Sequence, residues 1–147
     1  MDKCNSIADK SLFLQNVTFE IGFERIEMAY SNEDIERIWQ TARKVEGMDA
    51  RMVRKDPCGA WIVRDKFGMS DNEYGWEVDH IYPRSLGGDD NPVNLRPMHC
   101  ANNRSKGDSY PSYIVAVTSD GKENKAVRRV LKVNKTKREV LDALYNK

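Results

Sequence analysis

The pattern of apolar and polar residues along the chain predicts a mixture of helices and strands. Residues 17–23 alternate strictly between the two classes, which is typical of a half-exposed strand. From Ile35 to Val45 apolar side chains recur at helical spacing, and Gly47 is placed to end that run. Ser31 stands where a helix N-cap belongs. We therefore expect a strand followed by an amphipathic helix that packs on a core.

The remaining two thirds of the chain contain shorter periodic segments separated by turn residues. Strands are expected at residues 60–63, 76–81, 94–98, 113–118 and 126–133, and a short helix at 99–106. A capping box formed by Thr136 and Glu139 predicts the start of a final helix. Segment 126–133 also fits helical spacing, so a helix is the alternative there.

Candidate chemistry is concentrated between Glu77 and Asp108. This window holds both histidines of the chain together with a carboxylate and two amides, namely His80, His99, Asp79, Asn94 and Asn103. Hydrolysis of a phosphodiester at neutral pH needs a base to make hydroxide, a cation near the phosphate, and a frame that fixes the base. The window offers a candidate for each role.

Two strands and a helix over this window would bring its polar residues to one point. On a helix, His99 and Asn103 are four positions apart and share a face. With Asp79 they supply an imidazole, an amide and a carboxylate, which suit one divalent ion completed by water. His80 then remains to take a proton from water. The duller alternatives are a surface histidine and an ordinary Asx-turn at Asn94.

The order of these residues resembles the HNH nuclease motif, whose fold is a ββα-metal unit. The elements are Asp-His, a glycine-rich loop, Asn-Leu and then Asn-Arg-Ser-Lys-Gly-Asp; a looser likeness extends upstream through residues 56–62 and 73–76. The resemblance implies that His80 is the general base and that Asn94 holds the loop and orients it. It also implies that Asp79 and Asn103 bind the metal, with His99 as an additional ligand.

Many members of that family carry zinc-binding CxxC pairs around the site, and this chain departs from that pattern. His99 and Asn102 stand at the second pair, and only Cys58 lies upstream. A closed zinc site needs about four Cys or His ligands. We therefore expect no structural zinc, and a core held by packing around Trp39, Trp61 and Trp76.

Composition sets the remaining limits. A chain of 147 residues with 39% hydrophobic residues suits one domain. It lacks an apolar run long enough to span a membrane, and its first thirty residues lack the pattern of a signal peptide. The three cysteines, Cys4, Cys58 and Cys100, are predicted to be free thiols. Together these features predict a cytoplasmic protein.

The net charge of +1 is unevenly distributed. Residues 1–50 are acidic, whereas residues 120–147 carry nine basic and four acidic side chains. Phosphate binding should therefore depend on the C-terminal part and on cations near the motif. The candidates for nucleic-acid binding are Arg84, Arg96, Arg104, Lys106, Arg128, Arg129 and Lys132.

Taken together, the sequence predicts an α+β protein of one domain over residues 1–147. A strand and helix (1–50) precede an HNH core (56–110), and a basic hairpin and helix (111–147) follow. The expected activity is metal-dependent endonucleolytic cleavage of DNA with Mg²⁺ or Mn²⁺, although Zn²⁺ or Ni²⁺ is also compatible with the ligands. Two alternatives are a non-catalytic DNA-binding module with the same fold and a structural domain that binds a protein through its acidic third.

Overall fold

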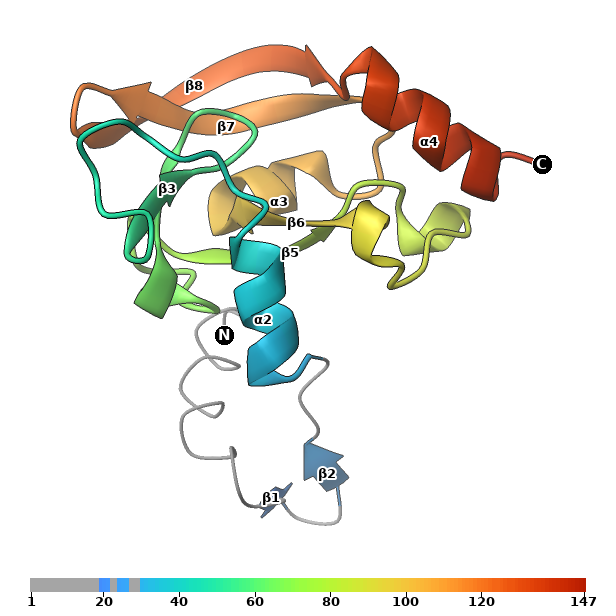
Figure 1. Ribbon diagram of the computed structural model, residues 1–147, viewed down its shortest axis with the longest axis horizontal. Coiled ribbons are helices and arrows are strands. Elements are labelled where there is room, and N and C mark those ends of the chain that lie inside the picture. Colours follow the sequence, from blue (N-terminus) through green and yellow to red (C-terminus); the bar gives the residue numbers. More distant parts are fainter. Residues whose placement is uncertain (1–18, 22–23, 27–29) are drawn as a thin grey trace.

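The computed structural model describes residues 19–21, 24–26 and 30–147, and it has the expected α+β architecture (Figure 1). Its strands form four two-stranded antiparallel hairpins within the described residues. The strands are β1 (Phe19–Ile21), β2 (Glu24–Ile26), β3 (Val53–Lys55), β4 (Trp61–Val63), β5 (Trp76–His80), β6 (Leu95–His99), β7 (Ser112–Asp120) and β8 (Glu123–Lys132). The α-helices are α2 (Asn32–Trp39), α3 (Cys100–Lys106) and α4 (Lys135–Tyr145), and short 3₁₀ turns cover Arg64–Lys66, Arg84–Leu86 and Pro92–Asn94.

The predicted ββα unit is present as β5, β6 and α3. β5 and β6 pair in antiparallel register, with Trp76 opposite His99 and His80 opposite Leu95. α3 follows β6 without a linker and ends at Gly107, whose φ of 52° favours glycine. In Figure 1, α3 lies between the β5–β6 hairpin and the long β7–β8 hairpin. The unit is therefore covered on its helical side by the C-terminal hairpin.

Two apolar clusters hold the chain together, one on each side of the β5–β6 hairpin. The first joins α2 to the hairpin and consists of Ile35, Ile38, Trp39, Ala42, Ile62, Trp76 and Leu95. The second joins the hairpin to the C-terminal elements and consists of Cys58, Ile81, Met98, Tyr113, Val115, Val133 and Leu141. The rings of Trp39 and Trp76 lie 5.2 Å apart at full burial, so both are core residues as predicted.

The apolar spacing predicts a helix that continues to Val45, but α2 ends at Trp39. The backbone of Arg43 pairs instead with that of Lys55 in an isolated β-bridge. The buried guanidinium of Arg54 also donates hydrogen bonds to three main-chain carbonyls of the segment 40–50. These long-range bonds compete with the local helix and draw the chain into an extended path.

Other boundaries also differ from the prediction. Asn134, and not Thr136, caps α4 by accepting a hydrogen bond from the backbone of Lys137 at 2.8 Å. Segment 126–133 is a strand, and the helical alternative is wrong. β3 is a strand that the sequence pattern did not predict. Part of the strand predicted at 17–23 lies outside the described residues, as does Cys4.

A buried carboxylate connects three parts of the chain. Oδ1 of Asp56 accepts hydrogen bonds from the backbone amides of Cys58 and Ala60, both at 2.9 Å. Oδ2 accepts from the backbone amide of His99 and from Nδ2 of Asn102, both at 3.0 Å. Burial raises the pKa of Asp56, whereas its four partners are all donors and favour the carboxylate form. We call this arrangement the Asp56 hub.

Asn102 extends the Asp56 hub to the C-terminal hairpin. Its Oδ1 accepts from the backbone amides of Ala116 and Val117, and its Nδ2 also donates to the carbonyl of Val117 at 2.9 Å. These contacts fall at an irregularity of the β7–β8 pairing between Val115 and Val117. The fully buried amide therefore fixes β7 against α3 where the ladder is interrupted.

Replacing the hub carboxylate tests its contribution to stability. In Asp56→Ala, four buried N–H groups lose their acceptor, and we expect the free energy of unfolding to fall by about 3–5 kcal/mol. Chemical denaturation monitored by tryptophan fluorescence measures this loss. Asp65→Ala is the matched control, because that side chain is 77% exposed and should change stability little. Equal stability of the two variants would contradict the role of the hub.

Candidate functional site

His80 ends β5, and its imidazole belongs to a polar cluster at the surface. The side chain is 18% exposed, and Nε2 lies 2.7 Å from Oδ1 of Asp90. The hydroxyl of Tyr30 is 3.3 Å from the same nitrogen and donates to Asp90 at 3.1 Å. Arg84 forms a third contact with that carboxylate oxygen at 2.7 Å. Asp90 thus lies between the histidine, a phenol and a guanidinium.

These contacts select one tautomer of His80. The hydrogen bond from His80, with those from Tyr30 and Arg84, lowers the pKa of Asp90, so the carboxylate is ionised and only accepts. Burial, followed by the nearby Asp90, raises the pKa of Tyr30 to about 12, which keeps its hydroxyl as a donor. Nε2 of His80 therefore carries the proton, and Nδ1 presents a lone pair. Nδ1 has no hydrogen-bond partner among the described residues.

Asn94 holds the loop that follows His80. Its Oδ1 accepts from the backbone amide of Tyr82 at 2.7 Å, and its Nδ2 donates to the carbonyls of Tyr82 and Asp89. The amide is fully buried, so the loop is fixed from inside. Gly88 completes the arrangement, because a Cβ there would lie 1.8 Å from the carbonyl oxygen of Tyr82. The geometry fits the predicted framing role for Asn94.

Asp79 points to the other face of β5 and is enclosed by two cations. One carboxylate oxygen lies 2.8 Å from Nε of Arg96, and the other lies 3.1 Å from Nζ of Lys106. The side chains of Asp79 and Lys106 are 3% and 0% exposed. Burial lowers the pKa of Lys106, while Asp79 acts in the opposite direction. Asp79 is thus part of a buried ion triad.

Asn103 lies on the same side of β5 and contacts a carboxylate that the sequence did not single out. Its Nδ2 donates to Oε1 of Glu77 at 2.7 Å. Glu77 and Asp79 are two residues apart on one strand and so face α3 together. Both Glu77 and Asn103 are partly exposed. The accessible oxygen donors on this face therefore belong to Glu77 and Asn103.

His99 does not join these residues. It is the N-cap of α3, where Nδ1 accepts from the backbone amide of Ala101 at 3.1 Å. Nε2 lies 2.8 Å from the carbonyl oxygen of Glu73, to which it donates. Both ring nitrogens are occupied, so the structure gives this residue a capping role in place of the expected metal ligation. The sequence predicted a helix that begins at His99, whereas α3 begins at Cys100 and His99 is its N-cap.

The cations expected to bind nucleic acid are divided between surface and interior. Arg84, Arg104, Arg128, Arg129 and Lys132 are exposed, and Arg129 also donates to the carbonyl of Cys58. Lys106 and Arg96 are not available in the same way. Their charged groups are turned inward to Asp79, and phosphate contacts by these two residues stay a prediction.

Sequence reasoning missed Asp90, Tyr30 and Glu77. Asp90 sits in a loop of turn residues, where an acidic side chain is ordinary. Tyr30 is fifty residues from His80, and nothing local links the two. Glu77 had a usable signal, because its distance of two from Asp79 places both carboxylates on one strand face.

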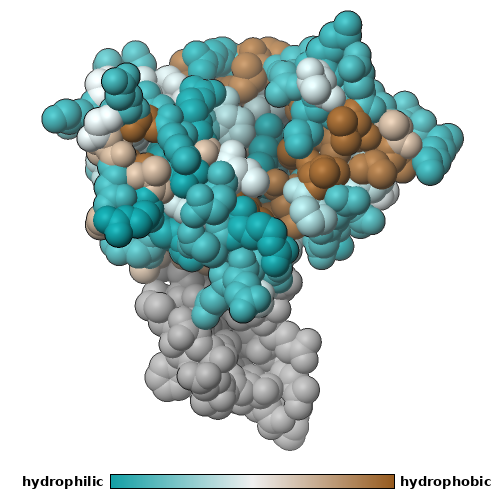
Figure 2. Space-filling view, viewed as in Figure 1, coloured by the Kyte–Doolittle hydropathy of each residue, from teal (hydrophilic) through white to brown (hydrophobic). Residues whose placement is uncertain are grey.

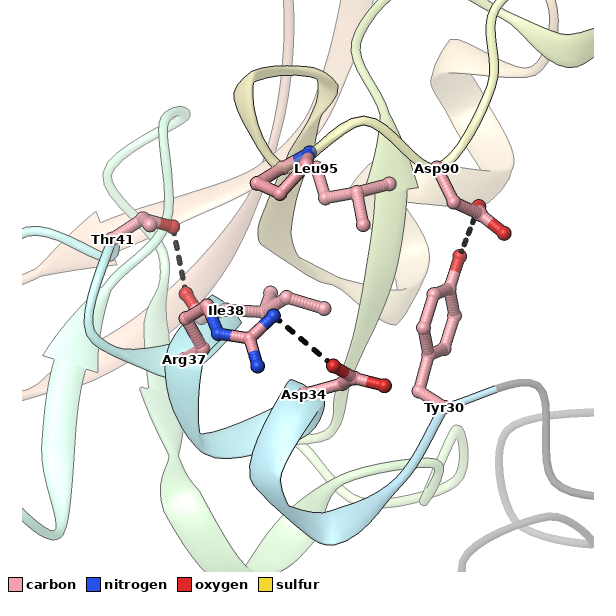
Figure 3. A pocket seen from close by; sticks show the side chains of 8 residues that line it. Tyr30, Asp34, Arg37, Ile38, Thr41, Asp90 and Leu95 are labelled. Atoms are coloured by element: carbon pink, nitrogen blue, oxygen red, sulfur yellow. Dashed lines mark hydrogen bonds and ion pairs between the residues drawn. The ribbon is translucent and has the colours of Figure 1, made fainter.

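A small cavity borders this cluster, with a volume of about 160 Å³. Figure 3 shows Tyr30 and Asp90 meeting at one end of it, with Arg37 from α2 and Thr41 from the following turn at the other.

Among the described residues, no group of three or more His, Cys, Asp and Glu side chains is arranged to hold a metal ion. A metal ion beside Glu77 and Asn103, on the other side of β5, would need the amide of Asn103 and water among its ligands.

Comparison with known proteins agrees with the geometry. The sequence profile of a family described as HNH endonuclease matches residues 67–112, which include β5, β6 and α3. No curated protein and no solved structure matches the chain. Within the described residues, no helix has the length and apolar character needed to cross a membrane.

The buried triad changes what a substitution of Asp79 should do. Asp79→Ala would leave the buried Lys106 and the largely covered Arg96 without their counter-ion, and we expect a loss of about 3–5 kcal/mol of stability. Glu77→Ala, on the same strand face but partly exposed, is the control and should cost much less. Thermal and chemical unfolding measure both. An Asp79→Ala variant as stable as wild type would show that this side chain faces a metal ion and not the interior.

Proposed function

Since the chain belongs to the HNH endonuclease family through residues 67–112, we propose that it hydrolyses DNA phosphodiester bonds with His80 as general base. The observation that carries this proposal is the hydrogen-bonded state of His80. Nε2 is engaged with Asp90, and Nδ1, on a partly exposed ring, has no hydrogen-bond partner among the described residues. This is the arrangement that a histidine needs to accept a proton from water.

The proposed reaction is an in-line displacement at phosphorus. Nδ1 of His80 takes one proton from a water molecule, and the water oxygen forms a bond to the scissile phosphorus. The bond from phosphorus to the leaving 3′ oxygen breaks, and that oxygen departs with the electron pair. Arg84 and Arg104, which are exposed near the motif, are the candidates to hold phosphate oxygens.

A divalent cation fits part of this site. The amide of Asn103 and the carboxylates of Glu77 and Asp79 are the oxygen donors that Mg²⁺ and Mn²⁺ prefer. Glu77 and Asn103 are partly exposed, whereas each oxygen of Asp79 already accepts from a buried cation and has only its remaining lone pair to offer. We therefore assign Asn103 and Glu77 as the principal ligands and Asp79 as a supporting one. When bound, the cation supplies charge stabilisation at the leaving oxygen.

Asp90 is proposed as a positioning residue that acts through His80. A carboxylate on the far nitrogen of an imidazole fixes the ring and its tautomer and stabilises the imidazolium after proton transfer. Tyr30 and Arg84 hold that carboxylate in turn. The base is thus oriented by an acid from the glycine loop, and Asn94 fixes that loop from inside.

The general base is tested by removing and replacing the imidazole. His80→Gly should lower the rate of plasmid nicking by roughly 10²–10⁴-fold. DNA binding should be retained, and added imidazole should restore part of the rate. An unchanged nicking rate in His80→Gly would assign the proton transfer elsewhere. Binding by a wild-type protein that never cleaves, with any divalent ion, would favour a non-catalytic DNA-binding module.

The positioning residue is tested by Asp90→Asn, which keeps the shape but removes the charge. We expect the rate constant for cleavage to fall about 10- to 100-fold, with DNA affinity near that of wild type. Asp89→Asn is the matched control from the same loop, and it should cleave at nearly the wild-type rate. A loss confined to affinity would instead make Asp90 part of the binding surface.

A further inference from the structure

A second, larger hollow adjoins the cavity next to His80. It has a volume of about 280 Å³ and runs between the turn after α2, β3, β6 and the start of α4. The two hollows share Thr41, Pro92 and Leu95 in their walls, so they lie next to each other. The first hollow is bounded at one end by Tyr30 and Asp90, which contact His80 (Figure 3). We call the second hollow the basic cleft.

The charge of the basic cleft is strongly unbalanced. Four of its lining side chains are cationic, and Asp56 is the one carboxylate among them. The Asp56 carboxylate already accepts four hydrogen bonds, and Arg96 is paired with Asp79. Three cations remain without an ion-pair partner among the described residues, namely Arg43, Lys55 and Lys137.

Each of these three cations retains donors for an anion. The side chain of Arg43 is exposed and makes no hydrogen bond or ion pair with the described residues. Lys137 donates one of its three protons to the carbonyl of Val93, and the ammonium of Lys55 lies 4.4 Å from the Trp61 ring centroid. Lys55 and Lys137 are thus held by neutral partners, and the charge of all three cations stays uncompensated.

Arg96, the fourth cation of the basic cleft, differs from the other three. Its Nη2 is buried and has no hydrogen-bond partner among the described residues, and its Nε is paired with Asp79. Because this guanidinium is turned inward, the cations available to an anion are Arg43, Lys55 and Lys137.

We propose that the basic cleft binds backbone phosphates of the DNA substrate that flank the scissile bond. This inference rests on the proposed function, because it takes DNA as the substrate and His80 as the reacting centre. A strand lying along the two hollows would present phosphates to the cleft while another part of its backbone lies beside His80. The cations Arg43, Lys55 and Lys137 lie outside the family match at 67–112. The face viewed in Figure 2 is mostly hydrophilic, with the largest hydrophobic patch on the side of α4 and smaller ones along its upper edge and at the left.

The test compares two charge-neutralised proteins in a His80→Gly background, which keeps the DNA intact. One carries Arg43→Gln with Lys137→Gln in the basic cleft. The matched control carries Arg128→Gln with Lys132→Gln on β8, where both side chains are exposed and line neither hollow. Binding to a labelled DNA duplex is followed by fluorescence anisotropy from low to physiological salt, and thermal unfolding verifies that each protein is folded.

The cleft variant should bind DNA on the order of tenfold more weakly, and the slope of log affinity against log salt should become shallower by about two. The β8 variant should lose less on both measures. The inference is overturned by a larger loss in the β8 variant, or by an unchanged slope in the cleft variant. It is also overturned if a 5′-mononucleotide stabilises the protein through these residues while duplex binding is unaffected, because the cleft would then be a small-anion site.

Failure of this inference differs from failure of the proposed function. If the wild-type protein nicks plasmid but the cleft variant binds duplex normally, the phosphate site is wrong and the nuclease assignment stands. If the cleft variant loses DNA affinity but wild-type protein does not cleave with any divalent ion, the binding site stands and the nuclease assignment is wrong.

Discussion

The carboxylate of Asp56 is the contact on which the arrangement of the nuclease unit depends. It binds its own loop, the end of β6 and the first turn of α3, and through Asn102 it also reaches β7. No pair of these elements shares a long hydrogen-bonded ladder, because each hairpin is an isolated pair of strands in the described residues. A buried acceptor with four donors supplies the missing connection. The position of α3 over β5, and hence of Asn103 beside Glu77, follows from it.

The Asp56 hub involves the positions at which the HNH resemblance would place zinc-binding pairs. His99, Asn102 and Cys58 stand at or near those ligand positions, and in this chain they are joined through Asp56. His99 contributes its backbone amide, while its ring caps α3. Burial, with the nearby Asp56, raises the pKa of Cys58 to about 12, so in the structure described the residue is a neutral thiol. Hydrogen bonds to Asp56 connect these positions in the described residues.

Successive side chains of β5 point to opposite faces of the strand, so the site has two parts. His80 faces Tyr30 and Asp90 on one side, while Glu77 and Asp79 face α3 on the other. In the proposed reaction, proton transfer and charge stabilisation would therefore come from opposite sides of one strand end. Asp79 also has a structural role, since it neutralises Arg96 and Lys106, on which the packing of α3 depends. A loss of activity on its removal is informative only when stability is measured alongside.

The sequence predicted what local pattern encodes. The strand ending in Asp79-His80, the helix ending at Gly107 and the β7–β8 hairpin as the first choice for its segment were accessible from spacing and turn chemistry. The framing role of Asn94 was an expectation from the HNH resemblance, and its hydrogen bonds to the loop fit that role. The errors arise where distant residues decide. Arg54 and the Arg43–Lys55 bridge shorten α2, and the pairing of Trp76 with His99 removes that histidine from the helix. Asp90 can be recognised as the partner of His80 only from the folded structure, in which the loop brings the two side chains together.

The most direct measurement follows thermal unfolding and plasmid nicking on one sample stripped of metal with EDTA. If the Asp56 hub holds the fold and a cation serves cleavage alone, the stripped protein will unfold at the same temperature as the untreated protein. It will not nick DNA until Mg²⁺ or Mn²⁺ is added. Unfolding on chelation, or refolding that requires stoichiometric zinc, would contradict this account by revealing a structural metal at the positions that Asp56 connects.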